Sequence, residues 1–193
     1  FLAHFWDGES AESFMQLNAK QLRTTEVDPS LARSIKKNPI TIILDNVLDT
    51  YNIGSIFRLA DAVAAEKVIL CGETLTPPNS RIKKASINTW GWVNWTYAET
   101  AMSAISNIKN QISNIKVIAV EQDARSKPFT TVHYEFPVAI VVGNETTGVS
   151  KEVLDVADTI VELPMWGINK SLNVMVSLGI VLYDMMRQVW KPR

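Results

Sequence analysis

Short runs of consecutive apolar residues alternate along this chain with stretches in which apolar residues recur at helical spacing. The runs are rich in β-branched residues, which is typical of strands that are covered on both faces of a sheet. They lie at residues 40–44, 68–70, 117–120, 138–142 and 159–163, and helical stretches lie between most of them at 53–65, 99–112 and 150–156. This alternation predicts an α/β fold with a mostly parallel sheet that is flanked by helices.

The N-terminal segment, residues 1–38, is polar and amphipathic and predicts a short helical extension. Within it, Asp28 and Pro29 suit the cap and the first turn of a short helix. No internal repeat, low-complexity segment or linker interrupts the remaining sequence. We therefore predict two parts, a helical extension at 1–38 and one compact domain at 39–193.

The last predicted helix, at residues 171–190, is apolar on almost every side. Two apolar stripes follow it at helical spacing: Leu172, Val176, Gly179, Tyr183 and Met186 form one, and Val174, Leu178, Val181, Leu182 and Met185 form the other. A helix of this kind has to be covered on more than one side. We expect the sheet on one side and a second copy of the chain on the other, and therefore predict a homodimer that forms through this helix.

The composition narrows the class of protein. Hydrophobic residues make up 47% and charged residues 20% of the chain, which indicates a folded domain rather than a disordered one. No apolar run approaches the ~18 residues of a membrane span, and the opening FLAHFW is too short for a signal peptide. We therefore expect a soluble protein with no membrane partner. Because the first residue is Phe1 rather than methionine, we also expect residues to be missing at the native N-terminus.

Cysteine, histidine and net charge limit the chemistry further. The single cysteine, Cys71, excludes an intramolecular disulfide and a multi-cysteine zinc site, and it fits a reducing cytoplasm. The two histidines, His4 and His133, are too few for a His-based site, so we expect no metal. The net charge of −1 identifies no partner, because only a clustered basic patch attracts a polyanion.

Three of the predicted strands are followed by loops of unusual polarity, and ligands of open α/β sheets bind beyond the carboxyl ends of strands. In the first loop, Asn52 is expected to cap the following helix, and Gly54 is expected to allow a close backbone approach. Arg58 follows about one turn later and has two interpretations. It pairs with Asp61 on the same helix, or it leans over the helix N-terminus, where free amides favour an anion such as phosphate.

The second loop, residues 141–150, has two glycines at the separation of a phosphate loop. Gly143 and Gly148 match that spacing, but Val149 stands where the loop needs lysine, which argues against a nucleotide triphosphatase. Glu145, between the glycines, is more often an acceptor of backbone amide hydrogen bonds than a catalytic group.

The third loop, residues 163–173, precedes the last helix. Ser171 is the default cap of that helix. Asn173, which is expected two residues into the helix, is out of place there because asparagine is an indifferent helix former. No Gly-x-Gly-x-x-Gly follows a predicted strand, so an ordinary dinucleotide-binding fold lacks its fingerprint.

Taken together, the three loops resemble the three sequence motifs of the SpoU/TrmH branch of the SPOUT methyltransferases. The motifs are Asn-x-Gly-x-x-x-Arg, Gly-x-Glu-x-x-Gly, and Pro-Met-x-Gly followed by Ser-Leu-Asn. The matching residues are, in that order, Asn52, Gly54 and Arg58, then Gly143, Glu145 and Gly148, then Pro164, Met165, Gly167, Ser171, Leu172 and Asn173. The resemblance extends over about residues 40–188, and three motifs in order are far more specific than any one of them.

The resemblance implies transfer of a methyl group from S-adenosylmethionine to a ribose 2′-hydroxyl of tRNA or rRNA. It implies a methyltransferase domain at 39–193, a dimer, and a deep C-terminal trefoil knot, which the rule that connections do not thread would not predict. By matching position, it also implies that S-adenosylmethionine is held largely by backbone groups of the loops. The implied cofactor-binding residues are Gly143, Asn144, Leu163, Met165 and Leu172.

The resemblance further implies that Arg58 activates the acceptor hydroxyl. A guanidinium stays protonated in ordinary proteins, so Arg58 is either a perturbed base or an electrostatic clamp on the adjacent phosphate and the developing alkoxide. We favour the clamp, with the phosphate or a water taking the proton. Asn52 would orient Arg58 or the nucleotide, Ser171 and Asn173 would position the ribose or the donor, and Glu145 would support its loop.

Basic residues bunch in the N-terminal extension and before three tryptophans. Trp90, Trp92 and Trp95 could stack on unpaired bases, but the alternate spacing of Trp90 and Trp92 also suits a strand with one buried face. We expect RNA to be held by Arg23, Arg33, Lys36, Lys37, Arg81 and Lys84. Since the sequence shows no separate N-terminal RNA-binding domain, we expect tRNA rather than rRNA.

Two other functions remain open at this point. A catalytically silent RNA-binding or assembly protein could share the scaffold, although a silent copy has no reason to keep Asn52, Arg58, Ser171 and Asn173 together. A small-molecule α/β enzyme could bind a different nucleotide. Thermal shift separates these, because S-adenosylmethionine or S-adenosylhomocysteine should stabilise the methyltransferase whereas NAD and ATP should not.

Overall fold

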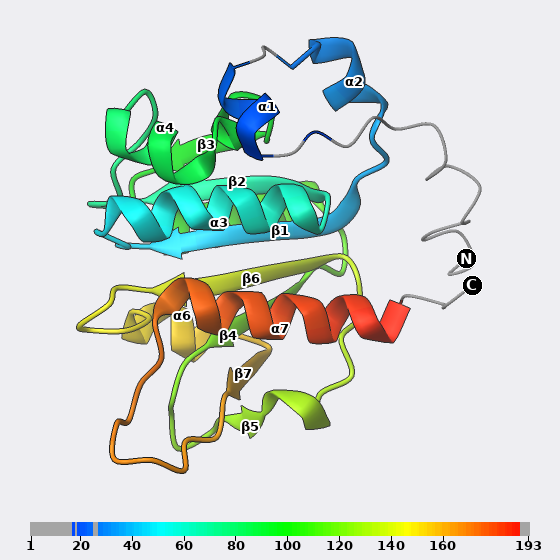
Figure 1. Cartoon of the computed structure of the whole chain (residues 1–193). Coiled ribbons are helices and arrows are strands. Elements are labelled where there is room, and N and C mark those ends of the chain that lie inside the picture. Colours follow the sequence, from blue (N-terminus) through cyan, green and yellow to red (C-terminus); the bar gives the residue numbers. More distant parts are fainter. Residues whose placement is uncertain (1–16, 18, 25–26, 190–193) are drawn as a thin grey trace.

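The computed structural model describes residues 17, 19–24 and 27–189 (Figure 1). Its helices are α1 (Ala19–Thr24), α2 (Pro29–Ser34), α3 (Thr50–Ala62), α4 (Ser80–Ser86), α5 (Ala101–Gln111), α6 (Lys151–Val156) and α7 (Val174–Val189), with short 3₁₀ helices η2 (Thr89–Gly91) and η3 (Phe129–Thr131). Its strands are β1 (Asn38–Asp45), β2 (Ala65–Cys71), β3 (Trp95–Ala98), β4 (Lys116–Val120), β5 (Lys127–Pro128), β6 (Val138–Gly143) and β7 (Thr159–Glu162).

All seven strands form one parallel sheet in the order β3-β2-β1-β6-β4-β7-β5. The predicted α/β class with a mostly parallel sheet is therefore confirmed. Every apolar run that the sequence marks as a strand is one. The edge strands β3 and β5 and the helix α4 were not predicted, because they are short and lack a continuous apolar run or a wide apolar face.

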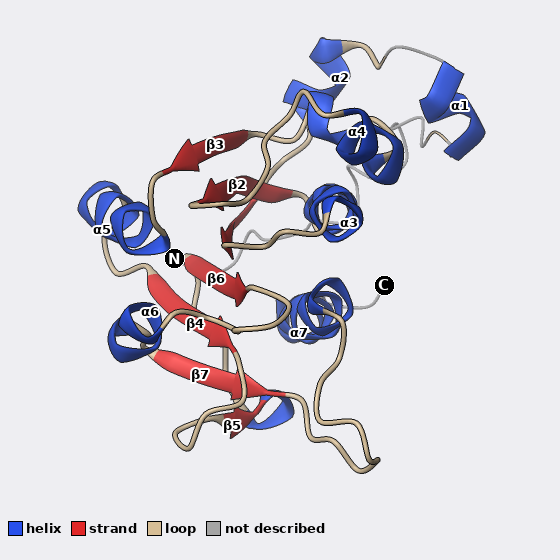
Figure 2. Cartoon of the chain, turned by 90° about the vertical axis from the view of Figure 1, so that its left-hand side faces the viewer, coloured by secondary structure: helices blue, strands red, loops and turns tan. Residues whose placement is uncertain are grey.

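Helices cover both faces of the sheet, α3 and α7 on one face and α5 and α6 on the other (Figure 2). The alternation of side chains along β1 explains this arrangement. Ile42 and Leu44 belong to the apolar cluster that contains Phe57 of α3 and Leu178 of α7, whereas Ile43 belongs to the opposite cluster with α5 and α6. Among the described residues, no helix is long and apolar enough to cross a membrane.

The three clustered tryptophans pack against the core, although not as the predicted strand. Trp90 lies in η2 and Trp92 directly follows it, and only Trp95 begins a strand, β3. All three are half-buried against the apolar cluster on the α3 side. The strand interpretation of Trp90 and Trp92 is therefore wrong, because a 3₁₀ turn rather than an extended segment carries them.

The N-terminal extension contains two short helices within its described part. Asp28 caps α2, since its carboxylate accepts a hydrogen bond from the Ser30 amide at 2.8 Å, and Pro29 occupies the first turn. The turn after α4 holds α1, because the Asn88 side chain donates to the Leu22 carbonyl at 2.8 Å. The cap at Asp28 was predicted and is confirmed.

All strands are parallel, but the direction in which successive strands are added to the sheet reverses at its centre. From β1 the chain crosses to β2 on one side, whereas β6 and β4 lie on the other side. Asp45 and Gly143 are register partners at the carboxyl ends of β1 and β6. A reversal of this kind opens a crevice at the carboxyl edge, which is where ligands of α/β sheets bind.

Candidate active site

An open cavity of about 450 Å³ lies at the carboxyl ends of β4, β6 and β7, beside the start of α7. This volume lies within the range of small-molecule sites, about 300–1,000 Å³. Three loops that are far apart in sequence converge on it, the loops after β4, β6 and β7. All five residues proposed from the motifs to bind the cofactor line the cavity, namely Gly143, Asn144, Leu163, Met165 and Leu172. Glu145, Ser171 and Asn173 line it as well, whereas Asn52 and Arg58 do not.

The loop after β6 folds tightly back on itself at the floor of the cavity. The Asn144 and Gly148 backbones pair across the turn, with N···O distances of 3.1 and 2.9 Å. A Cβ at Gly143 would lie only 2.1 Å from the Gly148 carbonyl carbon and 2.2 Å from the Val149 nitrogen. Position 143 therefore requires glycine because two backbone segments touch there, and not because a phosphate must approach.

Two polar residues at the end of β1 tie this loop to the centre of the sheet. Asp45, which is buried, accepts a hydrogen bond from the Ser150 amide at 2.8 Å and another from the Asn46 side chain at 3.0 Å. The Asn144 side chain in turn donates to the Asn46 carbonyl at 2.9 Å. These contacts fix the loops after β1 and β6 against each other.

A chain of side-chain hydrogen bonds joins all three motifs. The Asn52 amide nitrogen donates to Glu145 Oε1 at 2.8 Å, and the Asn52 oxygen accepts from the Asn173 amide nitrogen at 2.9 Å. Glu145 also accepts from the backbone amides of Leu48 and Asp49, each at 3.1 Å. Glu145 is thus an acceptor that holds the first loop, which matches the role expected of it from its loop position.

Asn173, and not Ser171, caps the last helix. Its side-chain oxygen accepts hydrogen bonds from the amides of Met175 at 3.0 Å and Val176 at 3.3 Å. The prediction of Ser171 as the cap is therefore wrong, since the helix begins two residues later than the apolar stripe indicates. The Ser171 amide instead donates to the Asn169 side chain at 3.2 Å. The unusual Asn173 is explained, because asparagine is among the best residues at an N-cap.

Asn52 does not cap its helix either. Asp49 does so, by accepting a hydrogen bond from the Tyr51 amide at 2.8 Å, and the helix already contains Asn52. Aspartate and asparagine cap about equally well, so the sequence alone could not decide between them. Gly54 does allow a close approach, but to α4: a Cβ there would lie 2.5 Å from that of Ala85.

We expect Asn173→Ala to lower the free energy of unfolding by about 1–2 kcal/mol, the usual cost of a lost side-chain cap. The substitution also removes the donor to Asn52. Ser171→Ala is the matched control and should change stability by less than about 0.5 kcal/mol. Urea unfolding monitored by circular dichroism measures both. Equal losses in the two variants would contradict the assignment of the cap.

The hydrogen bonds to Glu145 lower the pKa of its carboxyl group. Partial burial raises the pKa, but hydrogen bonds from the Asn52 side chain and from the backbone outweigh it, and the net pKa lies below the ordinary value. A depressed carboxyl pKa stabilises the fold at pH values above the unfolded pKa, and this stabilisation is lost as the pH falls through the folded pKa.

Glu145→Gln should therefore be less stable than the wild type at neutral pH, and the difference should shrink below about pH 4.3, the ordinary glutamate pKa. A glutamine has one acceptor oxygen for the three donors that Glu145 now satisfies. Urea unfolding at a series of pH values from about 7 to about 3 measures the difference. A difference that stays constant over this range would rule out the Glu145 charge as its cause.

Arg58 lies on the exposed side of α3, away from the cavity lining. It makes no hydrogen bond or ion pair with any residue in the described part of the chain. Asp61, the expected partner, accepts a hydrogen bond from the Trp92 indole nitrogen at 2.7 Å. The interpretation that Arg58 pairs with Asp61 is therefore wrong, and the guanidinium is free to bind a ligand.

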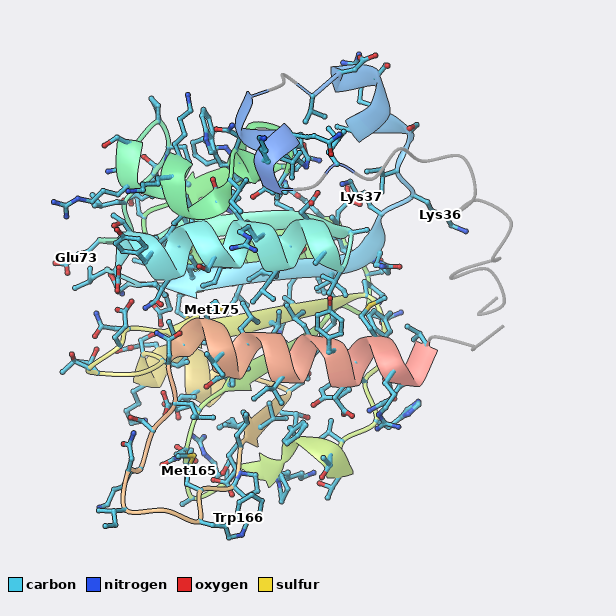
Figure 3. The ribbon with its side chains drawn as sticks, viewed as in Figure 1. Lys36, Lys37, Glu73, Met165, Trp166 and Met175 are labelled. Atoms are coloured by element: carbon cyan, nitrogen blue, oxygen red, sulfur yellow. The ribbon has the colours of Figure 1, made fainter. Side chains whose placement is uncertain are left out.

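Two of the residues expected to hold RNA lie far from the cavity. Lys36 and Lys37 directly precede β1, at the amino edge of the sheet, whereas the cavity lies at the carboxyl edge (Figure 3). The eight residues of β1 separate the two edges, which at ~3.3 Å per residue amounts to roughly 26 Å. Arg33 is exposed on α2, Arg81 and Lys84 are exposed on α4, and Arg23 lies in α1 with its side chain outside the described residues.

The loop after β4 also contributes to the cavity, and the sequence reasoning missed it. Glu121 Oε2 accepts a hydrogen bond from the Val149 amide at 2.9 Å, and the Gln122 side chain donates to the Lys170 carbonyl at 2.6 Å. The signal was present, because Glu121 and Gln122 directly follow the apolar run at 117–120. The three motifs contain neither Glu121 nor Gln122, so the motifs alone do not identify them.

Among the described residues, the charged side chains that line the cavity are all acidic. Glu121, Glu145 and Glu162 line it, and none of the described residues in its lining is Lys, Arg or His. Carboxylates in a confined site favour a cationic ligand and disfavour a polyphosphate. Among the described residues, no three His, Cys, Asp or Glu side chains are grouped closely enough to hold a metal ion.

The sequence model of the SpoU rRNA Methylase family matches residues 39–183. The tRNA (guanosine(18)-2′-O)-methyltransferase of Aquifex aeolicus is 32% identical over 159 residues, which cover 79% of this chain and 71% of that protein. The 23S rRNA (guanosine-2′-O-)-methyltransferase RlmB of Haemophilus influenzae is 29% identical over 170 residues, which cover 88% of this chain and 68% of that protein.

Solved structures agree with these sequence relatives. The TrmH/SpoU tRNA modifying enzyme of A. aeolicus superposes with a TM-score of 0.72 at 28% identity, over 88% of this chain and 81% of that one. An AdoMet-bound rRNA methyltransferase from Sinorhizobium meliloti superposes with a TM-score of 0.73 at 28% identity, over 83% of this chain and 61% of that one. The resemblance carried by the three motifs is confirmed, and this chain belongs to the SpoU rRNA methylase family.

Proposed function

We propose that this chain transfers the methyl group of S-adenosylmethionine to a ribose 2′-hydroxyl of tRNA or rRNA. The observation that carries the proposal is that the second and third family motifs line one carboxylate-lined cavity, while Asn52 of the first motif is hydrogen-bonded to Glu145 and Asn173 of that lining. The family membership and the 2′-O-methyltransferases among the relatives support the same reaction.

The cavity fits S-adenosylmethionine in size and charge. Its volume is that of a small-molecule site, and its carboxylates suit the positive sulfonium of the donor. When bound, S-adenosylmethionine supplies a methyl group that the sulfonium charge already activates. Gly143 and Asn144 of the loop after β6 would hold it, together with Leu163, Met165 and Leu172 of the loop after β7.

The protein has to align the acceptor and assist the loss of its proton. Alignment of two reacting groups can contribute about 7–11 kcal/mol. The hydrogen-bonded chain of Glu145, Asn52 and Asn173 supports that alignment, because it holds the first loop against the start of α7. Asn52 and Asn173 would thus be positioning residues, while Ser171, which lines the cavity, would contact the ribose or the donor.

Arg58 would act as an electrostatic clamp on the substrate. Its guanidinium is exposed and has no partner in the described part of the chain, so it is available to a phosphate group and to the developing alkoxide. Because a guanidinium stays protonated, the proton of the hydroxyl would pass to the phosphate or to a water. The RNA would have to reach Arg58 on α3 and the cavity together.

The test uses the purified protein, radiolabelled S-adenosylmethionine and total RNA from a strain that lacks the gene. We expect label in ribose 2′-O-methyl groups, at a position that wild-type RNA already carries modified. Thermal shift accompanies the assay, with stabilisation by S-adenosylmethionine and S-adenosylhomocysteine and none by NAD or ATP. Binding of the donor without label transfer would instead favour a silent RNA-binding protein.

The RNA substrate we propose is tRNA. The A. aeolicus relative is named as a tRNA enzyme and has the higher identity, while the H. influenzae relative is named as an rRNA enzyme. Separating the RNA of the same strain into tRNA and ribosomal fractions before the assay decides between them. Label confined to 23S rRNA would overturn the choice of tRNA.

We also propose that α7 carries a homodimer interface. Val176, Ile180 and Tyr183 are exposed large hydrophobic residues at positions i, i+4 and i+7 of this helix. The opposite side of the helix, with Leu178 and Val181, packs against the sheet. Val176 and Tyr183 belong to the first predicted stripe, whereas Ile180 belongs to neither, and Met186 of the first stripe packs against the core instead. A second copy would cover the exposed side of the helix.

Val176→Asp is expected to convert the dimer into a monomer, because it places a charge within the exposed apolar surface of α7. Val156→Asp is the matched control, since Val156 is a comparably exposed valine on α6, at the opposite face of the sheet. Sedimentation velocity of both variants and the wild type measures the mass in solution. A monomeric wild type would overturn the proposed interface.

The trefoil knot and the cytoplasmic location remain predictions of the same proposal. The knot is supported by the family membership, because the motif-bearing loops after β6 and β7 are the segments that the resemblance implies to be knotted. The boundary proposed at residue 39 is supported by the start of the family match at the same residue. A cytoplasmic location is consistent with an RNA substrate.

A further inference from the structure

The loop that joins β7 to α7 places two large apolar side chains in solvent. Trp166 is 91% exposed and Ile168 is 103% exposed. Met165, next to Trp166, lines the cavity, whereas Trp166 lies at the outer edge of the loop (Figure 3). One short segment therefore presents an inner side to the proposed cofactor and an aromatic outer side to solvent.

Hydrogen bonds fix the C-terminal half of this loop. The Gln122 side chain donates to the Lys170 carbonyl at 2.6 Å, and the Ser171 amide donates to the Asn169 side chain at 3.2 Å. Asn173 then anchors the end of the loop to α3 through Asn52. The loop projects beyond the body of the sheet in both views (Figures 1 and 2), so its tip is available to a partner.

We infer that Trp166 stacks on an unpaired base of the RNA beside the nucleotide that is methylated. This inference rests on the proposed function, since a 2′-hydroxyl that accepts a methyl group has to enter the cavity that Met165 lines. The flanking nucleotides then lie beside this loop, in which Trp166 directly follows Met165. Splayed bases of single-stranded RNA stack on aromatic side chains, and Lys170, exposed four residues later, supplies a cation for the backbone.

A second copy of the chain is the competing occupant of this tip. The apolar stripe of Val176, Ile180 and Tyr183 lies within α7, while Trp166 precedes that helix on the projecting loop. The adjacency of Trp166 to Met165, which lines the cavity, and the exposed Lys170 in the same loop favour RNA. Oligomeric state is therefore measured in the same experiment.

The experiment compares Trp166→Ala, Trp166→Phe and Ile168→Ala with the full-length wild type. The probes are unfractionated tRNA and 23S rRNA from the strain that lacks the gene, with binding measured by filter retention. Loss of one base–aromatic stack should raise the Kd of the preferred RNA about 5- to 100-fold in Trp166→Ala. Trp166→Phe keeps a ring and should stay within about 3-fold of the wild type.

Ile168→Ala is the matched control, because it removes exposed apolar surface from the same tip without removing a ring. We expect its Kd for RNA to change less than about 2-fold. The Kd for S-adenosylmethionine, measured by calorimetry, should be unchanged in all three variants. RNA should quench tryptophan emission in the wild type, and this quenching should be weaker in Trp166→Phe.

Four results would overturn the inference. They are an unchanged RNA Kd in Trp166→Ala, an equal loss in Ile168→Ala, a shift of Trp166→Ala from dimer to monomer, and weaker S-adenosylmethionine binding with unchanged RNA binding. In each case the wild type would still transfer methyl groups to RNA, so the proposed function would stand. A wild type that neither binds nor methylates either RNA would instead overturn the proposed function itself.

Discussion

Gly143→Ala is expected to abolish binding of S-adenosylmethionine and to lower the free energy of unfolding by roughly 3 kcal/mol. The reason is steric. The added Cβ would lie 2.1 Å from the Gly148 carbonyl carbon and 2.2 Å from the Val149 nitrogen. Both are backbone atoms. The Val149 nitrogen itself donates to Glu121, and the next amide, that of Ser150, donates to Asp45, so the loop cannot yield without losing these hydrogen bonds.

Gly167→Ala is the matched control for this prediction. Gly167 belongs to another of the three motifs, but a Cβ there would meet no atom within 4 Å. We expect its stability to differ from the wild type by less than about 0.5 kcal/mol. Calorimetric titration with S-adenosylmethionine and urea unfolding measure the two effects. Normal donor binding by Gly143→Ala would show that the cavity floor is not part of the donor site.

Arg58→Ala is expected to lower kcat about 100- to 1,000-fold, the usual effect of removing one group that stabilises a developing oxyanion. Arg58→Lys keeps the charge but loses the planar fork that binds phosphate in two places, and we expect it to lose at least about 10-fold in kcat. Because Arg58 does not line the cavity, the Kd for S-adenosylmethionine should not change. Single-turnover methyl transfer and calorimetry measure the two quantities.

Arg125→Lys is the control for Arg58→Lys. Arg125 is also exposed, but Asp123 and Asp155 already bind its guanidinium. Its substitution should leave kcat within about 2-fold of the wild type, as at other surface positions. Near-normal turnover by Arg58→Lys would contradict both a clamp and a base at Arg58, since lysine has neither the planar guanidinium geometry nor the pKa of arginine.

The strands and most helices were predictable because their signal is local. A continuous β-branched run such as the one in β6 has to be covered on both faces, and β6 is buried along its whole length. The short edge strand β3 was missed because it has four residues and none of them is buried. The strand interpretation of Trp90 and Trp92 rested on their spacing by two alone, and a 3₁₀ turn carries them instead.

The helix caps show where local reasoning fails. Asp49 and Asn52 both precede apolar residues of α3, and both types are good caps. Ser171 and Asn173 pose the same choice before α7. The structure assigns the caps to Asp49 and Asn173, which leaves Asn52 free to bridge Glu145 and Asn173.

The sequence by itself determined which residue types meet at the carboxyl edge of the sheet, because the motifs and the apolar runs are short-range patterns. Only the tertiary structure decided which side chains touch. Asn52 is 93 residues from Glu145 and 121 residues from Asn173, and a hydrogen bond over such separations depends on the strand order. The same holds for Asp61, whose partner is Trp92, 31 residues away, because a side chain binds the donor that packing brings to it.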